Sequence, residues 1–232
     1  PTPDRAYLLL DGVSGGNHGH WDGNSILRFT DNGRMWLCEG DYLKGDAKDH
    51  NTVTVMRNAE GGSPQTIVEL RASHATAKWT VTVTRTPDYQ GLNWDRHIVW
   101  HRLSDTFLVM DQFTALEPGN YDVTSRFRSL GETSLIDRVW SVTQADNERF
   151  YIHAPGDGRL TEGTVPEDAK NWKKYAYAAP TPKLFMHRLT RNLQPGMSMT
   201  VPNTFYAAGP NAPPRIETSM TAPNGLTSKG DL

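Results

Sequence analysis

The sequence predicts a mostly β protein, an antiparallel β-sandwich built from two sheets with little helix. Short segments in which apolar and polar residues alternate recur along the chain, and the clearest is Ala77–Thr86, where valines face one side and threonines the other. Turn-forming residues, such as Glu117–Asn120, separate these segments. A chain of 232 residues, 37% of them hydrophobic, is long enough to enclose one large β core. Short strands joined at regular intervals by turns are typical of sandwiches and barrels.

The individual elements follow from local patterns. Asn-Gly within Asp31–Gly33 predicts a hairpin between the strands Ser25–Thr30 and Met35–Gly40, because this dipeptide adopts the tight turns that join adjacent strands. Only Glu167–Tyr175 has helical character, and it is weak. The other expected strands are Ala6–Leu10, Thr52–Arg57, Ala77–Thr86, Arg96–Leu103, Phe107–Ala115, Tyr121–Ser129, two or three between Leu135 and Ile152, and two near Leu184–Thr190 and Met199–Ala207.

Composition and charge narrow the class of protein. The 24 basic and 26 acidic residues give a net charge of −2, which argues against general affinity for nucleic acid. No apolar run approaches the length of about 18 residues that a transmembrane helix needs, so no membrane span is expected. The single cysteine, Cys38, excludes an internal disulfide. We assign residues 1–208 to the β-sandwich and residues 209–232, rich in proline, glycine and serine, to a tail or linker.

Three of the eight histidines lie in two short polar motifs near the start of the chain. His18, His20 and Asp22 are spaced two residues apart, which places all three side chains on one face of an extended backbone. The predicted hairpin then ends in Glu39, and a short polar loop leads to His50. Two imidazoles and a carboxylate that converge in this way suit a zinc ion. Spacing alone also leaves open a set of loop histidines engaged in ordinary hydrogen bonds.

Three further groups combine charged and aromatic residues. Trp94–His97 and Trp100–Arg102 mix cations with rings, as sites for acidic sugars do, although a strand whose tryptophans close the core is the favoured alternative. Arg126 and Arg128 share one face of a strand with acidic and polar neighbours, so an anionic-polymer groove and a solvated face with cross-strand ion pairs are equally open. Lys170–Lys174 surrounds a tryptophan, and a charged surface turn is the favoured interpretation there.

The first quarter of the chain contains an ordered set of motifs. Tyr-Leu-Leu-Leu-Asp begins at Tyr7, and a glycine-rich approach leads to His-Gly-His-x-Asp at His18. A hydrophobic hairpin then closes on an acidic residue, and His-Asn-Thr-Val begins at His50. This run, from Tyr7 to Val55, resembles the heparinase II/III-like β-sandwich domain of polysaccharide lyases, which act on heparin, heparan sulfate, alginate and related uronate polymers. The remainder of the chain is compatible in pattern and has no equally specific motif.

The resemblance implies roles for the residues of these motifs. His18 would be the catalytic residue that faces the substrate cleft. His20, Glu39 and His50 would hold a zinc ion as the cofactor, and the ion would fix the loop that presents the cleft residue. The residues expected to bind substrate are Asn17, Trp21, Asn24 and Arg96.

Two departures from the family pattern affect these assignments. The family commonly has Asp-Pro-Gly where this chain has Glu39-Gly40-Asp41, which leaves Glu39 or Asp41 as the carboxylate ligand. It also commonly has a basic residue shortly before His-Asn-Thr-Val, where this chain offers only Lys44 and Lys48. Asp22, with Asp41, is expected to lie outside the metal's own ligands and to orient an imidazole through its other ring nitrogen.

For the protein as a whole, the resemblance implies part of a lyase that cleaves a 4-linked, uronic-acid-containing polysaccharide, such as a glycosaminoglycan or alginate, by β-elimination. In these lyases an α/α toroid precedes the sandwich and supplies a proton-transferring tyrosine and a polar residue that neutralises the uronate carboxylate. Nothing in this sequence resembles the toroid, so we expect an incomplete enzyme whose partners are a toroid domain or chain and the anionic polysaccharide. A periplasmic or secreted location follows from the same resemblance. The alternative is a non-catalytic carbohydrate-binding or accessory module whose cluster only pins a loop.

Overall fold

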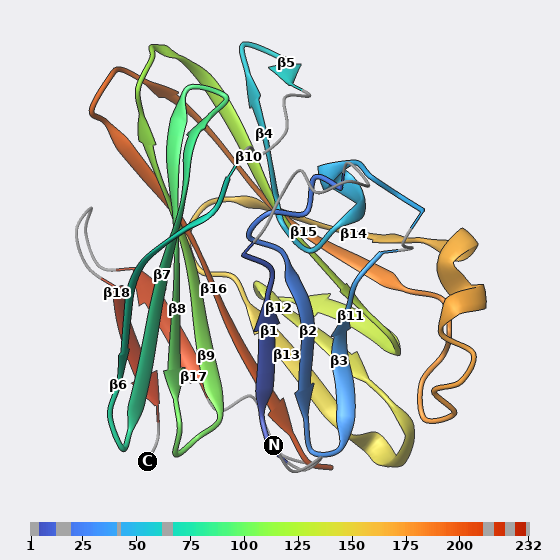
Figure 1. Cartoon of the computed structure of the whole chain (residues 1–232). Helices are drawn as coiled ribbons and strands as arrows, with labels where there is room; N and C mark the ends of the chain where they lie inside the picture. The colour runs from blue at the N-terminus through green and yellow to red at the C-terminus, as the bar shows by residue number, and fades with distance from the viewer. Residues whose placement is uncertain are drawn as a thin grey trace.

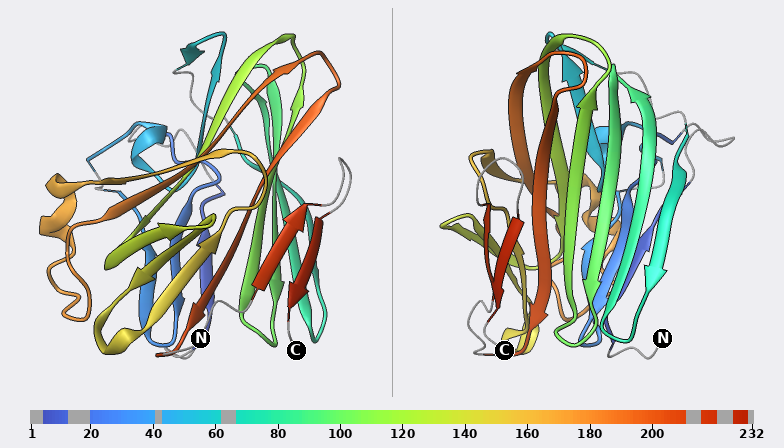
Figure 2. Two further views of the ribbon diagram at one scale, coloured as in Figure 1. Left: turned by 180° about the vertical axis from the view of Figure 1, so that it is seen from behind. Right: turned by 90° about the vertical axis from the view of Figure 1, so that its left-hand side faces the viewer.

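The computed structural model describes residues 5–12, 20–40, 43–61, 67–210, 216–220 and 226–230. Strands dominate the described chain and pair in an antiparallel manner, so the predicted mostly β fold is confirmed. A long, strongly twisted sheet forms one layer, and two shorter sheets pack against it (Figures 1 and 2). No helix in the described part of the chain has the length and apolar character needed to cross a bilayer.

The large sheet has eight strands in the order β11-β12-β13-β16-β9-β8-β7-β6. Strand β9 buries every second residue, so one face of this sheet lines the interior, as the period of two requires. Strand β6 was not predicted, because nearly all its side chains are exposed and its apolar residues do not alternate. The bounds are β6 Glu69–Ala75, β7 Trp79–Tyr89, β8 Leu92–His101, β9 Thr106–Ala115, β11 Glu132–Ile136, β12 Val139–Thr143, β13 Arg149–His153 and β16 Ser198–Ala208.

The opposite layer consists of a three-stranded sheet, β1-β2-β3, and a five-stranded sheet, β14-β15-β10-β4-β5. The predicted hairpin is confirmed as β2 and β3, and its turn residues Asn32 and Gly33 have φ of 52° and 69°, the left-handed values that favour Asn-Gly. The bounds are β1 Tyr7–Leu10, β2 Ile26–Asp31, β3 Arg34–Cys38, β4 Val53–Arg57, β5 Glu60–Gly61, β10 Gly119–Ser129, β14 Arg159–Thr164 and β15 Lys183–Leu193.

Helical structure is limited to short 3-10 segments in the described chain. The weak helix expected at Glu167–Tyr175 is only the 3-10 turn η3, Pro166–Asn171. The other two are η1, Ala47–Asp49, and η2, Ala145–Asn147. Within the predicted tail, β17 (Ile216–Met220) pairs with β18 (Leu226–Gly230) to form a two-stranded sheet, which composition alone did not indicate.

Buried aromatic rings join the two layers. The Phe29 and Trp36 rings of the hairpin lie 5.4 and 5.8 Å from that of Phe150 on the large sheet. The Phe127 ring of β10 meets Phe205 of β16 edge to face, at 4.9 Å. All five side chains are fully buried. These contacts hold the hairpin and the five-stranded sheet on the same face of the large sheet, and burial of each ring contributes about 1.5–3 kcal/mol.

His187 of β15 is buried between the layers and gives the fold a predictable dependence on pH. Its Nδ1 lies 3.1 Å from Asn203 Oδ1. Its Nε2 packs closely against Gly158, where the Cβ of any other residue would lie only 2.4 Å from this nitrogen. Burial lowers the pKa of His187 to about 4, so the folded protein holds this imidazole neutral. Between pH 6.5 and 4 the unfolded chain therefore binds a proton that the folded chain does not, and acid destabilises the fold.

We expect wild type to lose about 3 kcal/mol more of its unfolding free energy than His187→Gln between pH 7 and pH 4. Burial raises the pKa of Asp31 to about 6, which acts in the opposite direction over part of this range, so the comparison between variants is the measurement, not the slope of wild type. Urea unfolding at several pH values measures this difference in unfolding free energy between the two proteins. Equal slopes for wild type and His187→Gln would contradict the prediction.

Candidate metal centre and adjoining pocket

The fold brings together three residues from the two polar motifs. His20, Asp22 and His50 each offer a ligand atom within 4.8 Å of those of the other two. The imidazole centroids of His20 and His50 are 5.7 Å apart, and their planes are tilted by 52°. His50 is buried, whereas His20 and Asp22 are partly exposed, so the cluster opens to the surface on their side.

Backbone hydrogen bonds place the two segments beside each other. Trp21 N–H donates to the carbonyl of Gly45 at 2.9 Å, which ties the first motif to the loop that leads to η1. His50 N–H donates to the carbonyl of Ala47 at 3.2 Å and so closes the η1 turn immediately before the second motif. The convergence is therefore built into the main chain and does not depend on a bound ion.

The residues after His50 anchor the cluster, and sequence reasoning did not assign them a role. The buried Asn51 amide donates to the carbonyls of Ile26 and Cys38 at 3.0 and 2.7 Å. Its oxygen accepts from Arg128 N–H at 2.7 Å, so one side chain links β2, β3 and β10. Thr52 Oγ1 donates at 2.9 Å to the carbonyl of Gly23, the residue that follows Asp22. The sequence signal for this anchoring role is the polar pair Asn51 and Thr52, which lies between His50 and strand β4.

His50 presents one ring nitrogen to Glu39 and the other to the cluster. Its Nδ1 lies 3.0 Å from Glu39 Oε1, while its Nε2 is buried and has no hydrogen-bond partner among the described residues. Burial opposes protonation of the ring, but the hydrogen bond and charge of Glu39 outweigh it, so the pKa of His50 lies above its usual value. When His50 is neutral with its proton on Nδ1, the Nε2 lone pair faces the cluster, which is the arrangement of a metal-binding histidine.

The roles predicted for Glu39 and Asp22 are not those that the geometry favours. Besides His50, Glu39 Oε1 accepts from the backbone N–H groups of Gly40 and Asn51 at 3.0 and 3.2 Å. Its Oε2 accepts from Ser25 Oγ at 2.6 Å. Because both of its carboxylate oxygens are engaged, Glu39 orients the His50 imidazole through Nδ1, the ring nitrogen that does not face the cluster. Asp22, expected behind an imidazole, instead lies with the two histidines.

The donor set fits a zinc ion. Two imidazole nitrogens and one carboxylate oxygen are common zinc ligands, and a buried Nε2 with no other partner is costly unless something binds it. His20, Asp22 and His50 would hold such an ion, with Glu39 fixing the orientation of His50. A bound ion would join the loop at residues 20–22 to the start of β4 and would place positive charge at the surface there.

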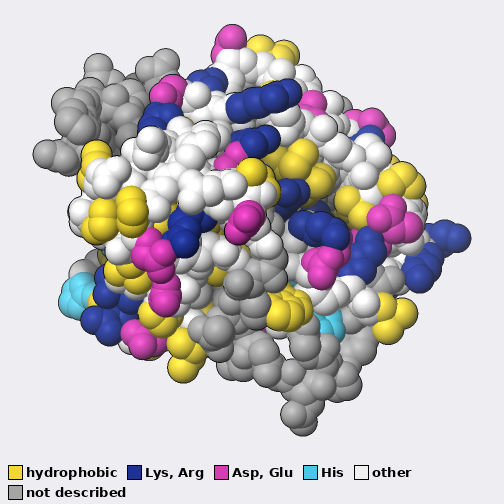
Figure 3. Space-filling model, turned by 90° about the horizontal axis from the view of Figure 1, so that it is seen from above, with side chains coloured by type: hydrophobic (Ala, Val, Ile, Leu, Met, Phe, Trp, Pro, Cys, Tyr) yellow, Lys and Arg dark blue, Asp and Glu magenta, His cyan; other side chains and the backbone are white. Residues whose placement is uncertain are grey.

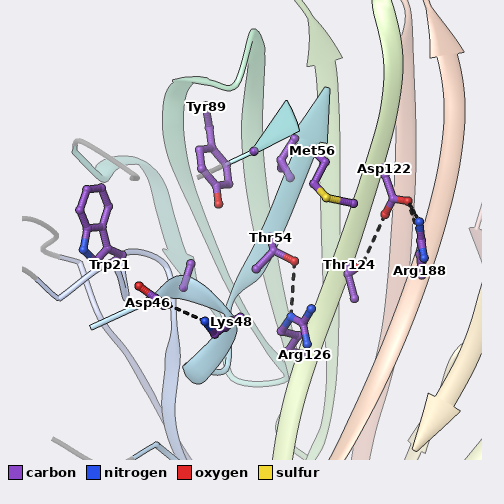
Figure 4. Close-up of a pocket in the computed structure, with 13 residues that line it drawn as sticks. Trp21, Asp46, Lys48, Thr54, Met56, Tyr89, Asp122, Thr124, Arg126 and Arg188 are labelled. Carbon is purple, nitrogen blue, oxygen red and sulfur yellow. Dashed lines mark hydrogen bonds and ion pairs between the residues drawn. The ribbon is translucent and has the colours of Figure 1, made fainter. Parts of the chain in front are cut away.

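A pocket of about 550 Å³ adjoins this cluster on the outer face of the five-stranded sheet. Trp21, between two members of the cluster, and Lys48, two residues before His50, both line it. Seen from above, the molecule presents several basic side chains near the centre of the view, with acidic side chains between them (Figure 3). The close-up shows Trp21 and Lys48 on one side of the pocket and Arg188 on the other (Figure 4).

Comparison with solved structures gives a consistent result. The heparan sulfate lyase HepC from Pedobacter heparinus matches with a TM-score of 0.72 and 14% identity, over 96% of this chain and 37% of its own. A heparinase III gene product matches at 0.75 and 13%, over 98% and 38%. A further heparinase III structure matches at 0.71 and 12%, over 99% and 39%. The chain has the heparinase III β-sandwich fold.

The heparinase-like sandwich of this chain spans less than two fifths of the length of the lyases that it matches. At 12–14% identity the likeness establishes the fold and not the activity. No protein-family model and no curated protein sequence matches the chain. The longer neighbours indicate that such a sandwich has a companion domain in those proteins.

The structure places the predicted substrate-binding residues in different environments. Trp21 is partly exposed and lines the pocket beside the cluster. Asn24 and Arg96, by contrast, have no exposed surface, which argues against the predicted contact with substrate. Arg96 pairs with Asp111 in the interior, as the core interpretation of that strand requires. His18, Asn17 and Asp41 lie outside the described residues.

The buried Arg96 has a supporting role instead. Its guanidinium donates to the backbone carbonyl of Asn24, two residues from Asp22. The Asn24 side chain is held in turn by Thr84 Oγ1, which donates to it at 2.6 Å, and by Thr86 Oγ1, which accepts from it at 3.2 Å. The large sheet thereby anchors the loop that carries one corner of the metal cluster.

Proposed function

We propose that this chain is the β-sandwich part of a polysaccharide lyase that cleaves a 4-linked uronic-acid polymer by β-elimination. The observation that carries the proposal is the cluster of His20, Asp22 and His50 beside an open pocket on a heparinase III fold. The neighbours, one of which is a heparan sulfate lyase, support the proposed polymer class. Such polymers are met outside the cytoplasm, and we propose a periplasmic or secreted location accordingly.

The reaction removes the proton at C5 of the uronate and expels the oxygen at C4, which leaves an unsaturated sugar end. Because the C5 proton is only weakly acidic, a base and an acid must be positioned and the carboxylate must be neutralised. We assign His18 to the cleft as an acid, base or hydrogen-bond donor. A zinc ion held by the cluster would fix the chain at His20, two residues after His18 in the sequence. The remaining groups would come from a toroid domain.

The test is the absorbance near 235 nm that the unsaturated product generates when uronate polymers are incubated with the protein. This chain alone is expected to give little or no turnover, because one wall of the cleft is missing. The same chain joined to, or co-expressed with, a matching toroid domain should give robust turnover. Rapid turnover by the 232 residues alone would refute the division of the active site between two domains. Polymer binding without cleavage by the joined protein would favour the non-catalytic carbohydrate-binding module.

The metal assignment separates Asp22 from Glu39. Asp22→Ala is expected to abolish zinc binding, because it removes one of three protein ligands. Glu39→Gln keeps all three and loses only the charge behind His50, so it should weaken zinc binding by about 10–100-fold. Competition titration with a chromophoric chelator and elemental analysis measure both effects, and the exposed Asp46→Ala serves as the control. Retention of zinc by Asp22→Ala and its loss from Glu39→Gln would restore Glu39 as the ligand.

A further inference from the structure

The pocket beside the metal cluster has a floor set by strand register. Successive outward residues of β10, Asp122, Thr124 and Arg126, form its centre. In the paired strands, Thr54 of β4 and Arg188 of β15 lie on either side of Thr124. Three strands thus contribute polar side chains to one concave surface (Figure 4).

The walls of the pocket are of two kinds. On one side stand the Trp21 ring and η1, which includes Lys48. The lining also includes the less polar residues Val55, Met56 and Tyr89, the last held by a hydrogen bond from its hydroxyl to the carbonyl of Val53 at 3.2 Å. The volume of about 550 Å³ falls within the range typical of small-ligand sites. A mixture of flat apolar and polar walls suits a sugar ring better than a bare inorganic anion.

The charges in the pocket do not balance locally. Arg188 donates to Asp122 Oδ2 at 2.5 Å, and Lys48 donates to Asp46 at 2.6 Å, so both have carboxylate partners. Arg126 has weaker partners: its Nε donates to Thr54 Oγ1 at 3.4 Å, and its Nη1 lies 3.1 Å from a methionine sulfur. No ion pair within the described residues includes Arg126.

Partial burial of Arg126 makes this imbalance costly. Burial, together with the charge of the neighbouring Arg128, lowers the pKa of the Arg126 guanidinium below its usual range, although Asp49 and Asp122 act in the opposite direction. A partly buried cation that lacks a close carboxylate gains most from an anion that approaches through the open side of the pocket. The planar guanidinium can hold a carboxylate or a sulfate through two parallel hydrogen bonds.

We propose that this pocket is a subsite for one acidic sugar unit, with Arg126 bound to its carboxylate or sulfate group and Trp21 against its ring. The identity of the ligand rests on the proposed lyase function, whereas the anion preference rests on the pocket itself. Since Trp21 lies between His20 and Asp22, a chain bound here extends past the metal cluster. The subsite therefore selects acidic polymers and sets their register along the cleft.

Three tetrasaccharides distinguish the source of the anion in a binding experiment on the wild-type chain. Heparosan tetrasaccharide carries carboxylates without sulfate, sulfated chitotetraose carries sulfates without carboxylate, and chitotetraose is neutral. We expect one or both of the acidic probes to shift the Arg126 side-chain Nε–H resonance in NMR spectra, and the neutral probe to leave it unchanged. No shift with either acidic probe, or an equal shift with the neutral one, overturns the proposal.

Variants then measure the contribution of the guanidinium. Arg126→Gln should weaken binding of the acidic probe by at least about tenfold, the loss expected for a hydrogen-bonded charge, and Arg126→Lys should fall between it and wild type. Arg191→Gln is the matched control, because Arg191 lies on β15 outside the pocket and pairs with Asp157 at 2.6 Å. Its affinity should stay within twofold of wild type. Equal affinities for Arg126→Gln and Arg191→Gln would refute the subsite.

This experiment is independent of cleavage. Binding that depends on Arg126, without any product that absorbs near 235 nm from the joined enzyme, would sink the lyase function and leave the subsite standing. Cleavage to which Arg126 makes no contribution would support the lyase function and refute the subsite. Because the NMR measurement uses the wild-type chain, it decides the question even where Arg126→Gln does not fold.

Discussion

Replacing His18 with alanine in the complete enzyme is expected to lower the turnover number by roughly a hundred- to ten-thousandfold, the usual effect of removing general acid–base assistance. Zinc content and melting temperature should remain close to those of wild type, because His18 is not among the proposed ligands. The lost group acts on the transition state, so the change should appear in kcat far more than in the affinity for substrate.

His20→Ala, two residues away, should behave differently. It removes one of the three side chains that converge at the cluster, so zinc should be lost. Metal that binds only the folded state adds directly to its stability, and the free energy of unfolding should fall by a few kcal/mol. Zinc analysis, thermal melting and turnover on the two variants side by side test the pair. Loss of zinc from His18→Ala and its retention by His20→Ala would reverse the two roles.

The buried pair of Arg96 and Asp111 should dominate stability within the large sheet. Asp111 Oδ1 accepts from Trp94 Nε1 at 2.8 Å and from Arg96 Nε at 2.7 Å, and its Oδ2 accepts from Arg96 Nη2 at 2.9 Å and Ser125 Oγ at 3.2 Å. Neither charged side chain has any exposed surface. Asp111→Ala leaves a guanidinium buried without its counter-charge and should cost about 3–5 kcal/mol.

Two comparisons isolate this effect. Asp95→Ala breaks the bidentate pair with Arg85, at 2.7 Å on both oxygens, but this pair is partly exposed and should cost no more than about 1 kcal/mol. The double variant Arg96→Met with Asp111→Leu removes both charges and should recover part of the loss, because no unpaired charge remains buried. Trp94 Nε1 and Ser125 Oγ still lose their acceptor, so recovery should be incomplete. Urea unfolding measures all three. Equal destabilisation by Asp111→Ala and Asp95→Ala would contradict the prediction.

The Arg96 network also connects stability to the metal cluster. Arg96 donates to the carbonyl of Asn24, so its displacement in Asp111→Ala should loosen the loop that carries Asp22. A weaker zinc affinity in Asp111→Ala than in Asp95→Ala, measured under conditions where both remain folded, is the expected consequence.

Much of this molecule follows from short-range patterns. Alternating residues identified the buried strands, and the Asn-Gly turn identified the β2–β3 hairpin, because strand period and turn geometry are properties of a few adjacent residues. The same hairpin explains why His20 and His50 meet despite their separation in the chain. Among the strands that escaped prediction, β6 and β14 have few or no buried residues and hence little alternation to detect.

The division of labour between the two carboxylates needed the tertiary structure. In the sequence, only the family resemblance distinguishes the two, and it assigns Glu39 to the metal and Asp22 to a place beyond the ligands. The structure separates them because Ser25 and Asn51, from two other segments, bind the Glu39 carboxylate and hold it behind His50. Asp22 remains on the side of the free ring nitrogen.

The two arginines proposed for an acidic ligand show the same limit. Arg96 and Arg126 each lie in a strand among polar and acidic residues, and the sequence alone determined only that much. Register decides the rest: Arg96 lies opposite Asp111 across β8 and β9 and faces the interior, whereas Arg126 lies opposite Met186 and faces the pocket. Which residue stands across a strand depends on pairing between distant segments, so whether a cation is neutralised inside the protein or left for a ligand is a property of the assembled sheets.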